Sequence, residues 1–253
     1  MIKIGIIGGS GLDDPDILVS SKKISVETPY GQPTSDLTIG QISEVPVVLI
    51  SRHGTKHQFS PAEVNYRANI HAMKEQGVTH IIATTACGSL QEKIGRGDFV
   101  IIDQFIDFTR FRQNTFFTSF KNGIHHTPMA DPFDQMMRDA LYQAGSSLGY
   151  RIFNGGTVIT IEGPRFSTRA ESKMFRTWGA DVINMSIATE ACLANDAEIP
   201  YAVVAMSTDY DCWKEDEPPV SWEDVFAVFE KNAENVKKLI IKAIPDIYQR
   251  ATK

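Results

Sequence analysis

The segment Ala202-Val203-Val204-Ala205-Met206-Ser207-Thr208-Asp209-Tyr210-Asp211-Cys212-Trp213 joins a strand pattern to a pair of acids, and it decides how the chain folds. Its first five residues form an apolar run, which is typical of a buried strand. Asp209 and Asp211 follow where that strand should end. If the extended geometry continues, both side chains point to one side of the sheet, because side chains alternate along a strand. Ligands of α/β sheets bind beyond the carboxyl ends of the strands, so we expect an acid–base site here.

Two carboxylates in one half-buried site cannot both ionise freely, so we expect the pKa of one of them to be raised. Each unit of such an increase corresponds to about 1.4 kcal/mol. A raised pKa would let one of the two aspartates donate a proton to a ligand. A solvated acidic turn remains the alternative, because perturbed carboxylates also occur in purely structural networks.

The composition excludes two classes of function. The chain has 253 residues, of which 42% are hydrophobic, and we interpret residues 1–253 as a single domain. A net charge of −6 argues against a nucleic-acid surface, which would show a basic stripe. No apolar stretch approaches the ~20 residues that a membrane span needs. We therefore expect small molecules as partners, and neither nucleic acids nor membranes.

The N-terminus and the cysteines predict the compartment. The run Met1-Ile2-Lys3-Ile4 leads directly into a strand pattern without the features of a signal peptide. The three cysteines, Cys87, Cys192 and Cys212, are odd in number and lack the spacing of metal ligands. We expect reduced thiols that pack as small side chains, a cytoplasmic location and no metal site.

Apolar patterns and capping signals alternate along the chain, as they do in α/β folds. We expect strands at 2–7, 37–41, 45–50, 80–84, 98–103, 152–153, 157–161, 182–184 and 202–206, of which 37–41 and 45–50 form a hairpin. We expect helices at 60–76, 131–148, 168–178, 189–197 and 222–243, several of them between a capping box and a glycine. Residues 104–120 are typical of a long functional or interface loop. Pro245 should lie beyond the last helix.

A glycine-rich turn, Gly8-Gly9-Ser10-Gly11, follows the first strand. It is not a dinucleotide fingerprint, because the third glycine would fall at Asp14, and no Gly-Lys-Ser/Thr follows to make a Walker loop. Two interpretations remain. The backbone N–H groups and the Ser10 hydroxyl converge on an anion, or the segment is a tight turn after an edge strand.

Polar or small side chains in five groups follow predicted strands, and we expect them to share one site along one edge of the sheet. They are Ser10, Arg52 with His53, Thr85 with Ala86, Phe166 and Ser167 with Met185 and Ser186, and Asp209 with Asp211. The arginine, with His53 as a further donor and the hydroxyls, suits phosphate. The aromatic ring with carboxylate acceptors suits a flat nitrogenous base that carries an amino group. Phosphate and a purine in one site imply a nucleotide ligand or the phosphorolysis of a nucleoside.

The same residues carry a resemblance that extends over nearly the whole chain. The matching segments include Gly5-Ile6-Ile7-Gly8-Gly9-Ser10-Gly11-Leu12, Glu27-Thr28-Pro29-Tyr30-Gly31, Arg52-His53-Gly54, Val64-Asn65-Tyr66-Arg67-Ala68-Asn69, 84–90, 161–172, Asn184-Met185-Ser186 and 208–213. In this order they resemble the 5′-methylthioadenosine phosphorylases, a family within the trimeric purine nucleoside phosphorylases. The resemblance implies a three-layer α/β/α fold around a mixed central sheet and a homotrimer. It further implies phosphate-dependent cleavage of 5′-methylthioadenosine to adenine and 5-methylthioribose 1-phosphate, a salvage reaction with phosphate as co-substrate and no cofactor.

The resemblance also implies a role for each candidate residue. Phosphate would be bound by Ser10, Arg52, His53, Thr85, Ala86 and Ser186, with Met185 near the ribose. The base would be surrounded by Phe166, Ser167, Asp209 and Asp211, of which Asp209, Asp211 and Ser167 form the catalytic group and Asp209 donates the proton. The 5′ substituent would contact Val220, Trp222, Val225 and His126, the last contributed by a neighbouring subunit.

Two departures from the family pattern concern the 5′ substituent. Trp222 stands where a smaller aliphatic residue is expected, and the chain ends sooner than longer members, whose tail helps to cover this group. An aspartate at 209, where enzymes acting on 6-oxopurines carry asparagine, points to a 6-aminopurine. Two other functions stay open: a nucleotide-binding oxidoreductase, which the glycine turn favours, and a non-catalytic sensor of adenosine or methylthioadenosine.

Overall fold

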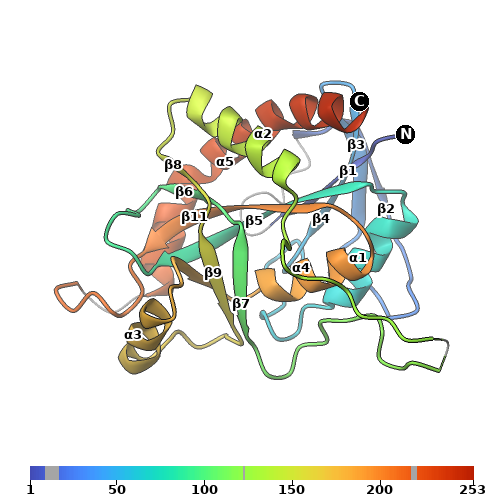
Figure 1. Cartoon of the computed structure of the whole chain (residues 1–253). Coiled ribbons are helices and arrows are strands. Elements are labelled where there is room, and N and C mark those ends of the chain that lie inside the picture. Colours follow the sequence, from blue (N-terminus) through green and yellow to red (C-terminus); the bar gives the residue numbers. More distant parts are fainter. Residues whose placement is uncertain (9–16, 122, 218–220) are drawn as a thin grey trace.

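A mixed β-sheet runs through the centre of the molecule and carries helices on both faces (Figure 1). The computed structural model describes residues 1–8, 17–121, 123–217 and 221–253. In these ranges the strands are β1 (Ile4–Gly8), β2 (Val19–Ile24), β3 (Leu37–Ile42), β4 (Val45–Ser51), β5 (His80–Ser89), β6 (Phe99–Ile101), β7 (Gln104–Phe108), β8 (Ile152–Asn154), β9 (Thr157–Ile161), β10 (Val182–Asn184) and β11 (Tyr201–Asp209). The helices are α1 (Tyr66–Glu75), α2 (Gln135–Ser147), α3 (Arg169–Thr177), α4 (Ile187–Asp196) and α5 (Trp222–Ala251).

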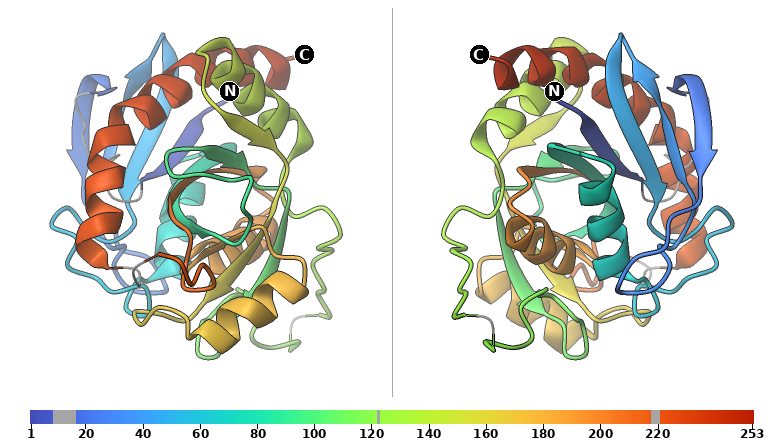
Figure 2. Two further views of the ribbon diagram at one scale, coloured as in Figure 1. Left: turned by 90° about the vertical axis from the view of Figure 1, so that its left-hand side faces the viewer. Right: turned by 90° about the vertical axis from the view of Figure 1, so that its right-hand side faces the viewer.

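Two apolar cores attach α1, α2, α4 and α5 to the two faces of the sheet, and a third, smaller core holds α3. Ile81 and Ile82 are neighbours on β5, and because side chains alternate along a strand they enter different cores. Ile81 packs in the core that contains residues of α1 and α4, and Ile82 in the core that contains residues of α2 and α5. Both views of Figure 2 show these helix pairs on opposite sides of the sheet. The predicted three-layer α/β/α fold is therefore confirmed.

The sheet branches at β5. This strand pairs in parallel with β1 and β11, and its last residues pair antiparallel with β10. One path runs in the order β2-β3-β4-β1-β5-β10-β9-β7, while β11 leads to β6 and β8. The carboxyl ends of β4, β1 and β11 consequently gather beside the second half of β5, where parallel strands place ligands.

The first and last helices differ from the prediction at one end each. The segment that starts at Ser60 forms a turn, in which the Glu63 carboxylate accepts from the N–H of Ser60 at 3.0 Å, and α1 begins only after Asn65, whose side chain caps it. The expected start at Ser60 is wrong because its capping signal closes a local turn. The expected end near Ala243 is also wrong, since α5 continues to Ala251 with Pro245 inside it. Buried apolar side chains beyond 243 favour the helix over the cost of the proline.

Four strands also differ from the prediction, and one of them, β2, was not predicted at all. β5 continues to Ser89 and β11 to Asp209, so segments expected to follow these strands belong to them. Residues 104–108, expected in a loop, form the edge strand β7 because they pair in parallel with β9. The other predicted elements agree with the structure to within a few residues. No helix in the described ranges has the length and the apolar character that crossing a membrane requires.

Candidate active site

A cavity of about 500 Å³ opens where the carboxyl ends of the parallel strands meet. Its wall includes most of the predicted site residues: Arg52, His53, Thr85, Ala86, Phe166, Ser167, Met185, Ser186, Asp209, Asp211 and Val225. These residues come from the loop after β4, from β5 and β11, from α5, and from the connections that follow β9 and β10. The fold thus brings side chains from distant parts of the chain into one cavity.

The remaining predicted residues are Ser10, Val220, Trp222 and His126. Ser10 and Val220 lie outside the described residues, as does the side chain of Trp222. His126 is exposed and belongs to the segment 109–130, where its ring lies 5.3 Å from that of Phe120. Within a single chain, His126 does not reach the cavity.

The backbone turns sharply between the two acids. Asp209 is the last residue of β11, and Asp211 has a φ of +49°, in the left-handed region. The extended geometry that was expected to place both carboxylates on one side of the sheet therefore does not continue past Asp209. The expected reason for their proximity is wrong. Both side chains nevertheless line the cavity, because the N–H of Asp211 donates to Oδ1 of Asp209 at 2.7 Å.

Gly88 of β5 leaves the space that the Asp209 carboxylate occupies. A bulge between Ser207 and Asp209 shifts the register of β11, so that Asp209 pairs with Gly88. A Cβ atom at Gly88 would lie 2.9 Å from Oδ1 of Asp209 and 3.0 Å from a methyl group of Ile183. A larger residue would displace the carboxylate from the cavity.

Burial makes Asp209 a weak acid. It raises the pKa of Asp209 to about 6, against hydrogen bonds from the N–H of Asp211 and the hydroxyl of Thr208 that lower it. The charge of Asp211 adds to the increase, but less than burial does, so the pairing of the two acids is the smaller cause. With this pKa, roughly one Asp209 side chain in ten carries a proton at pH 7.

Asp211 presents a carboxylate oxygen that lacks a well-formed hydrogen bond to the described residues. Its pKa is raised by burial, and the hydroxyls of Ser172 and Ser167 partly offset this increase. Its Oδ2 atom is buried and accepts no hydrogen bond of normal geometry from the described residues. A buried polar atom without a partner is costly, and an amino group of a ligand would supply the missing donor.

At the opposite end of the cavity Arg52 is held by a buried carboxylate. The Arg52 and Glu190 side chains are 1% and 2% exposed and form a two-pronged ion pair. The Nη1 atom of Arg52 also donates to the carbonyl oxygen of Thr84 at 2.8 Å. Burial alone would lower the pKa of Arg52, but Glu190 raises it overall, so the guanidinium stays charged.

His53 offers an acceptor rather than the expected donor. Its Nδ1 lies 2.9 Å from the carbonyl oxygen of Phe59 and must donate to it, since a carbonyl only accepts. Burial, with the charge of Arg52, lowers the pKa of His53 to about 4, so the ring is neutral at pH 7. Its Nε2 can therefore accept from a hydroxyl group of a ligand, and it can donate to an anion only after protonation.

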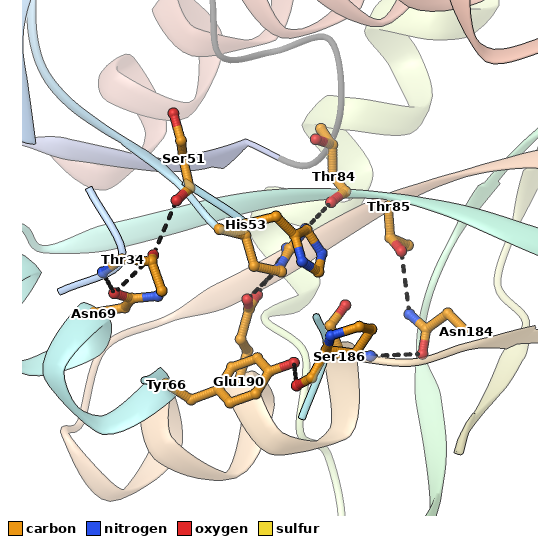
Figure 3. A network of polar contacts seen from close by, with 12 residues as sticks. Thr34, Ser51, His53, Tyr66, Asn69, Thr84, Thr85, Asn184, Ser186 and Glu190 are labelled. Atoms are coloured by element: carbon orange, nitrogen blue, oxygen red, sulfur yellow. Dashed lines mark hydrogen bonds and ion pairs between the residues drawn. The ribbon is translucent and has the colours of Figure 1, made fainter. Parts of the chain in front are cut away.

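Asn184 connects the small polar groups at this end of the cavity (Figure 3). Its Nδ2 donates to the Thr85 hydroxyl at 3.3 Å, and its Oδ1 accepts from the Thr160 hydroxyl at 2.8 Å. Ser186 is the N-cap residue of α4, and its hydroxyl makes no capping hydrogen bond. The Ser186 hydroxyl and the N-terminus of α4 can therefore face an anion in the cavity, while the N–H groups of Ser186 and Ala188 already donate to Asn184 and Thr160.

Several residues of this site were missed by sequence reasoning. They are Thr208, Asn184, Glu190 and Tyr201. Glu190 carried a signal, because a lone acid in the apolar segment 187–194 is buried only with a partner. Thr208 and Tyr201 are of types common in strands and gave no signal, whereas Asn184 is of a type depleted in strands and could have been noticed. No group of three or more metal-ligating side chains occurs in the part of the chain that the structure describes.

Comparisons with known proteins agree with this geometry. Residues 3–245 match the phosphorylase superfamily. The S-methyl-5′-thioadenosine phosphorylase of Danio rerio is 51% identical over 251 residues, which cover 98% of this chain and 90% of that protein. The enzyme of the same name from Xenopus tropicalis is 52% identical over 250 residues, covering 97% of this chain and 89% of that protein.

Solved structures extend the similarity to the whole fold. Methylthioadenosine phosphorylase from Schistosoma mansoni in complex with adenine has a TM-score of 0.93 and 39% identity, covering 100% of this chain and 93% of that chain. A mutant of the adenosine/methylthioadenosine phosphorylase from the same organism, in complex with methylthioadenosine, has a TM-score of 0.91 and 38% identity over the same shares. The chain therefore belongs to the phosphorylase superfamily and, within it, to the family of the S-methyl-5′-thioadenosine phosphorylases.

Proposed function

We propose that this protein cleaves the N-glycosidic bond of 5′-methylthioadenosine with phosphate, yielding adenine and 5-methylthioribose 1-phosphate. The observation that best supports the proposal is that the two ends of the cavity carry different chemical groups. Arg52 and the N-terminus of α4 lie at one end, and the carboxylates Asp209 and Asp211 lie at the other. An anion and a nitrogenous base can therefore be held together on one sugar.

In the proposed reaction the phosphate oxygen attacks C1′ while the bond from C1′ to the base breaks. The sugar passes through a state with oxocarbenium character, and its positive charge lies beside the bound phosphate. Electrons of the breaking bond go to the purine, which is a poor leaving group as an anion. Asp209 would donate its proton toward N7 of the purine, a contribution of roughly 10²- to 10⁴-fold. Phosphate is a co-substrate in this scheme, and no cofactor takes part.

The base would be selected by acceptors and an aromatic face. Oδ2 of Asp211 would accept from the 6-amino group, which supplies the donor that this buried atom lacks. The Phe166 ring, which is 40% exposed and lines the cavity, would stack on the purine. Ser167 lines the same end and would contact the base beside Asp211.

Phosphate would be bound by Arg52, Thr85, Ala86 and Ser186, with His53 accepting from a hydroxyl of the phosphate or the sugar. Ser10 would complete this set, and Met185 would lie near the ribose. Once Asp209 is covered by a bound purine, its carboxyl group would lose further contact with water, which raises its pKa. Binding of the base would thereby prepare the acid.

We also propose a homotrimer in which His126 of one chain completes the 5′ pocket of a neighbouring chain beside Val220, Trp222 and Val225. The segment that carries His126 exposes apolar side chains: Phe111, Phe120 and Ile124 are 85%, 47% and 80% exposed. Apolar exposure on this scale is typical of an interaction surface. Sedimentation equilibrium should give three times the chain mass, and Phe111→Ser with Ile124→Ser should lower that mass. A monomeric wild type would contradict the trimer.

We also propose a cytoplasmic location, because free cysteine thiols are typical of a reducing compartment. Cys87, Cys192 and Cys212 are free thiols in the structure, and burial raises the pKa of each of them, so none is an activated nucleophile. We further propose that residues 1–253 act as one nucleoside phosphorylase domain.

One assay tests the proposed function. Adenine release from methylthioadenosine, adenosine and inosine is measured with and without phosphate. We expect rapid release from methylthioadenosine only when phosphate is present, with stoichiometric formation of a sugar 1-phosphate. Tight binding without release would favour a sensor, and reduction of a nicotinamide cofactor would favour an oxidoreductase; either result contradicts the proposal.

A further inference from the structure

The guanidinium of Arg52 makes most of its hydrogen bonds inside the protein. Nε and Nη2 donate to the two carboxylate oxygens of Glu190, and Nη1 donates to the carbonyl oxygen of Thr84. A guanidinium carries five N–H donors, so with respect to the described residues one remains on Nη1 and one on Nη2. Arg52 lines the cavity and is 1% exposed, so only a ligand seated directly against the guanidinium would use these two donors.

Glu190 is itself held in place by Tyr201. The Tyr201 hydroxyl donates to Oε2 of Glu190 at 2.7 Å, and the tyrosine is 1% exposed. Burial, and after it the charge of Glu190, raises the pKa of Tyr201, which therefore keeps its proton. Glu190 lies on α4 and Tyr201 at the start of β11, and neither contributes to the wall of the cavity. Neither would touch a ligand directly, and the two residues form a chain of contacts that ends at Arg52.

We propose that Glu190 and Tyr201 are positioning residues for the phosphate co-substrate, which hold the guanidinium of Arg52 so that its two remaining N–H donors face the phosphate. This inference rests on the proposed function, because it takes phosphate as the ligand of Arg52.

The charges explain why orientation is decisive. Glu190 cancels the charge of Arg52, so the pair as a whole attracts an anion weakly. Binding then depends on where the two N–H groups point, together with the N-terminus of α4. A buried ion pair gives little net stability compared with apolar residues of the same size. A hydroxyl that fixes the carboxylate of this pair is thus better explained by the geometry of Arg52 than by stability.

Two substitutions separate orientation from charge. Glu190→Asp keeps the negative charge but withdraws the carboxylate by one methylene group, so it cannot hold Nε and Nη2 together. Tyr201→Phe removes only the hydroxyl. Tyr150→Phe is the matched control, because its hydroxyl donates to Asn235 at 3.3 Å in the core formed with α2 and α5.

The measurement is adenine release with each substrate varied at saturation of the other. We expect Glu190→Asp to raise the phosphate KM by about 10-fold or more, and Tyr201→Phe by about 3-fold. The nucleoside KM and kcat should stay within about 2-fold of the wild type in both, and Tyr150→Phe should change neither KM. Calorimetric titration with inorganic phosphate alone should show the same loss of phosphate affinity. In an Arg52→Lys background, Glu190→Asp should have no further effect, because the two changes remove one interaction.

The contrary results are equally definite. An unchanged phosphate KM in Glu190→Asp, or an equal rise in both KM values, would mean that the pair has only a structural role. If Glu190→Asp does not fold, the comparison of Tyr201→Phe with Tyr150→Phe decides by the same criterion. A wild type that binds phosphate but releases no adenine would refute the proposed function alone, since calorimetry would still test the positioning of Arg52.

Discussion

The backbone N–H of Asp211 donates a 2.7 Å hydrogen bond to the Oδ1 atom of Asp209, so the chain itself fixes one acid relative to the other. The Thr208 hydroxyl lies 2.8 Å from the other oxygen, Oδ2, of Asp209. Burial, rather than the neighbouring charge, is the main reason that the pKa of Asp209 is raised to about 6. The two acids are therefore distinct groups: Asp209 can carry a proton near neutral pH, and Asp211 has an acceptor oxygen free for a ligand.

Asp209→Asn should lower the turnover of adenine nucleosides by at least about 100-fold, because it removes the proposed general acid. Methylthioadenosine should still bind, since asparagine keeps the shape and can accept from the N–H of Asp211. Asp216→Asn, at an exposed position, is the control and should be neutral. Turnover close to that of the wild type would remove Asp209 from the mechanism.

The pH dependence of catalysis should report the same acid. The protonated form of Asp209 is the active one, so kcat/KM for the nucleoside at saturating phosphate should fall as pH rises above about 6. The corresponding decrease in kcat should come at higher pH, because the bound purine excludes water and raises the pKa further. Rate profiles between pH 5 and pH 9 test this. A kcat/KM that rises through this range would contradict it.

Asp209→Asn should also stabilise the protein at high pH. The pKa of Asp209 is higher in the folded state, about 6, than its ordinary value of 3.8. The folded state therefore binds the proton more tightly, and the stability of the wild type falls as pH rises from about 4 to about 6. Above that range the variant should gain up to about 3 kcal/mol in the free energy of unfolding. Urea titrations at pH 4 and pH 8 measure it, and an equal effect at both values would contradict the prediction.

Arg52→Ala should raise the phosphate KM roughly 10- to 150-fold, as expected for the loss of hydrogen bonds from a charged donor. It should also lower the free energy of unfolding by about 3–5 kcal/mol, because Glu190 is left buried and unpaired. Adding Glu190→Gln should recover part of that stability but none of the phosphate affinity. Arg250→Ala breaks an exposed ion pair with Asp246 and should cost less than about 1 kcal/mol. A larger effect on the nucleoside KM than on the phosphate KM would mean that Arg52 serves the other substrate.

The order of substrates should be methylthioadenosine above adenosine, with both far above inosine. The 6-oxo group of inosine would face the acceptors of Asp209 and Asp211, and a mismatch of buried polar groups can discriminate by as much as about 10⁴-fold. Selection of the 5′-methylthio group is apolar and weaker, about 1–3 kcal/mol for a group of this size. Steady-state assays at saturating phosphate measure the order. Comparable kcat/KM values for inosine and adenosine would refute the assignment of the base-selecting pair.

Apolar runs and capping signals were enough to predict the layered fold and most of its elements. The strand pattern of 202–206 and the capping box at Thr168 correspond to β11 and to the start of α3. The errors lie where a distant contact outweighs a local signal. Pro245 stays within α5 because the helix buries its apolar face, and 104–108 becomes a strand because β9 lies beside it.

The candidate site was predicted as a list of residues but not as a set of contacts. The sequence placed Arg52 and His53 at a strand end, yet the partners that define their chemistry come from other parts of the chain. Glu190 fixes the guanidinium from α4, and the carbonyl of Phe59 sets the tautomer of His53. Such pairings depend on the folded backbone, so no local pattern reveals them.

The long strand β5 contributes residues to both ends of the cavity, so the strand fixes the distance between the two ends. Thr85 lies at the phosphate end and Gly88 beside Asp209, three residues farther along the same strand, or about 10 Å. Substitutions at either end change what is bound there but leave this length unaltered. A nucleoside with a spacer between sugar and base would not reach both ends. An insertion in β5 that increased this distance would need a matching insertion in β11. The two strands pair residue by residue from Thr85–Ala205 to Gly88–Asp209, with a single bulge.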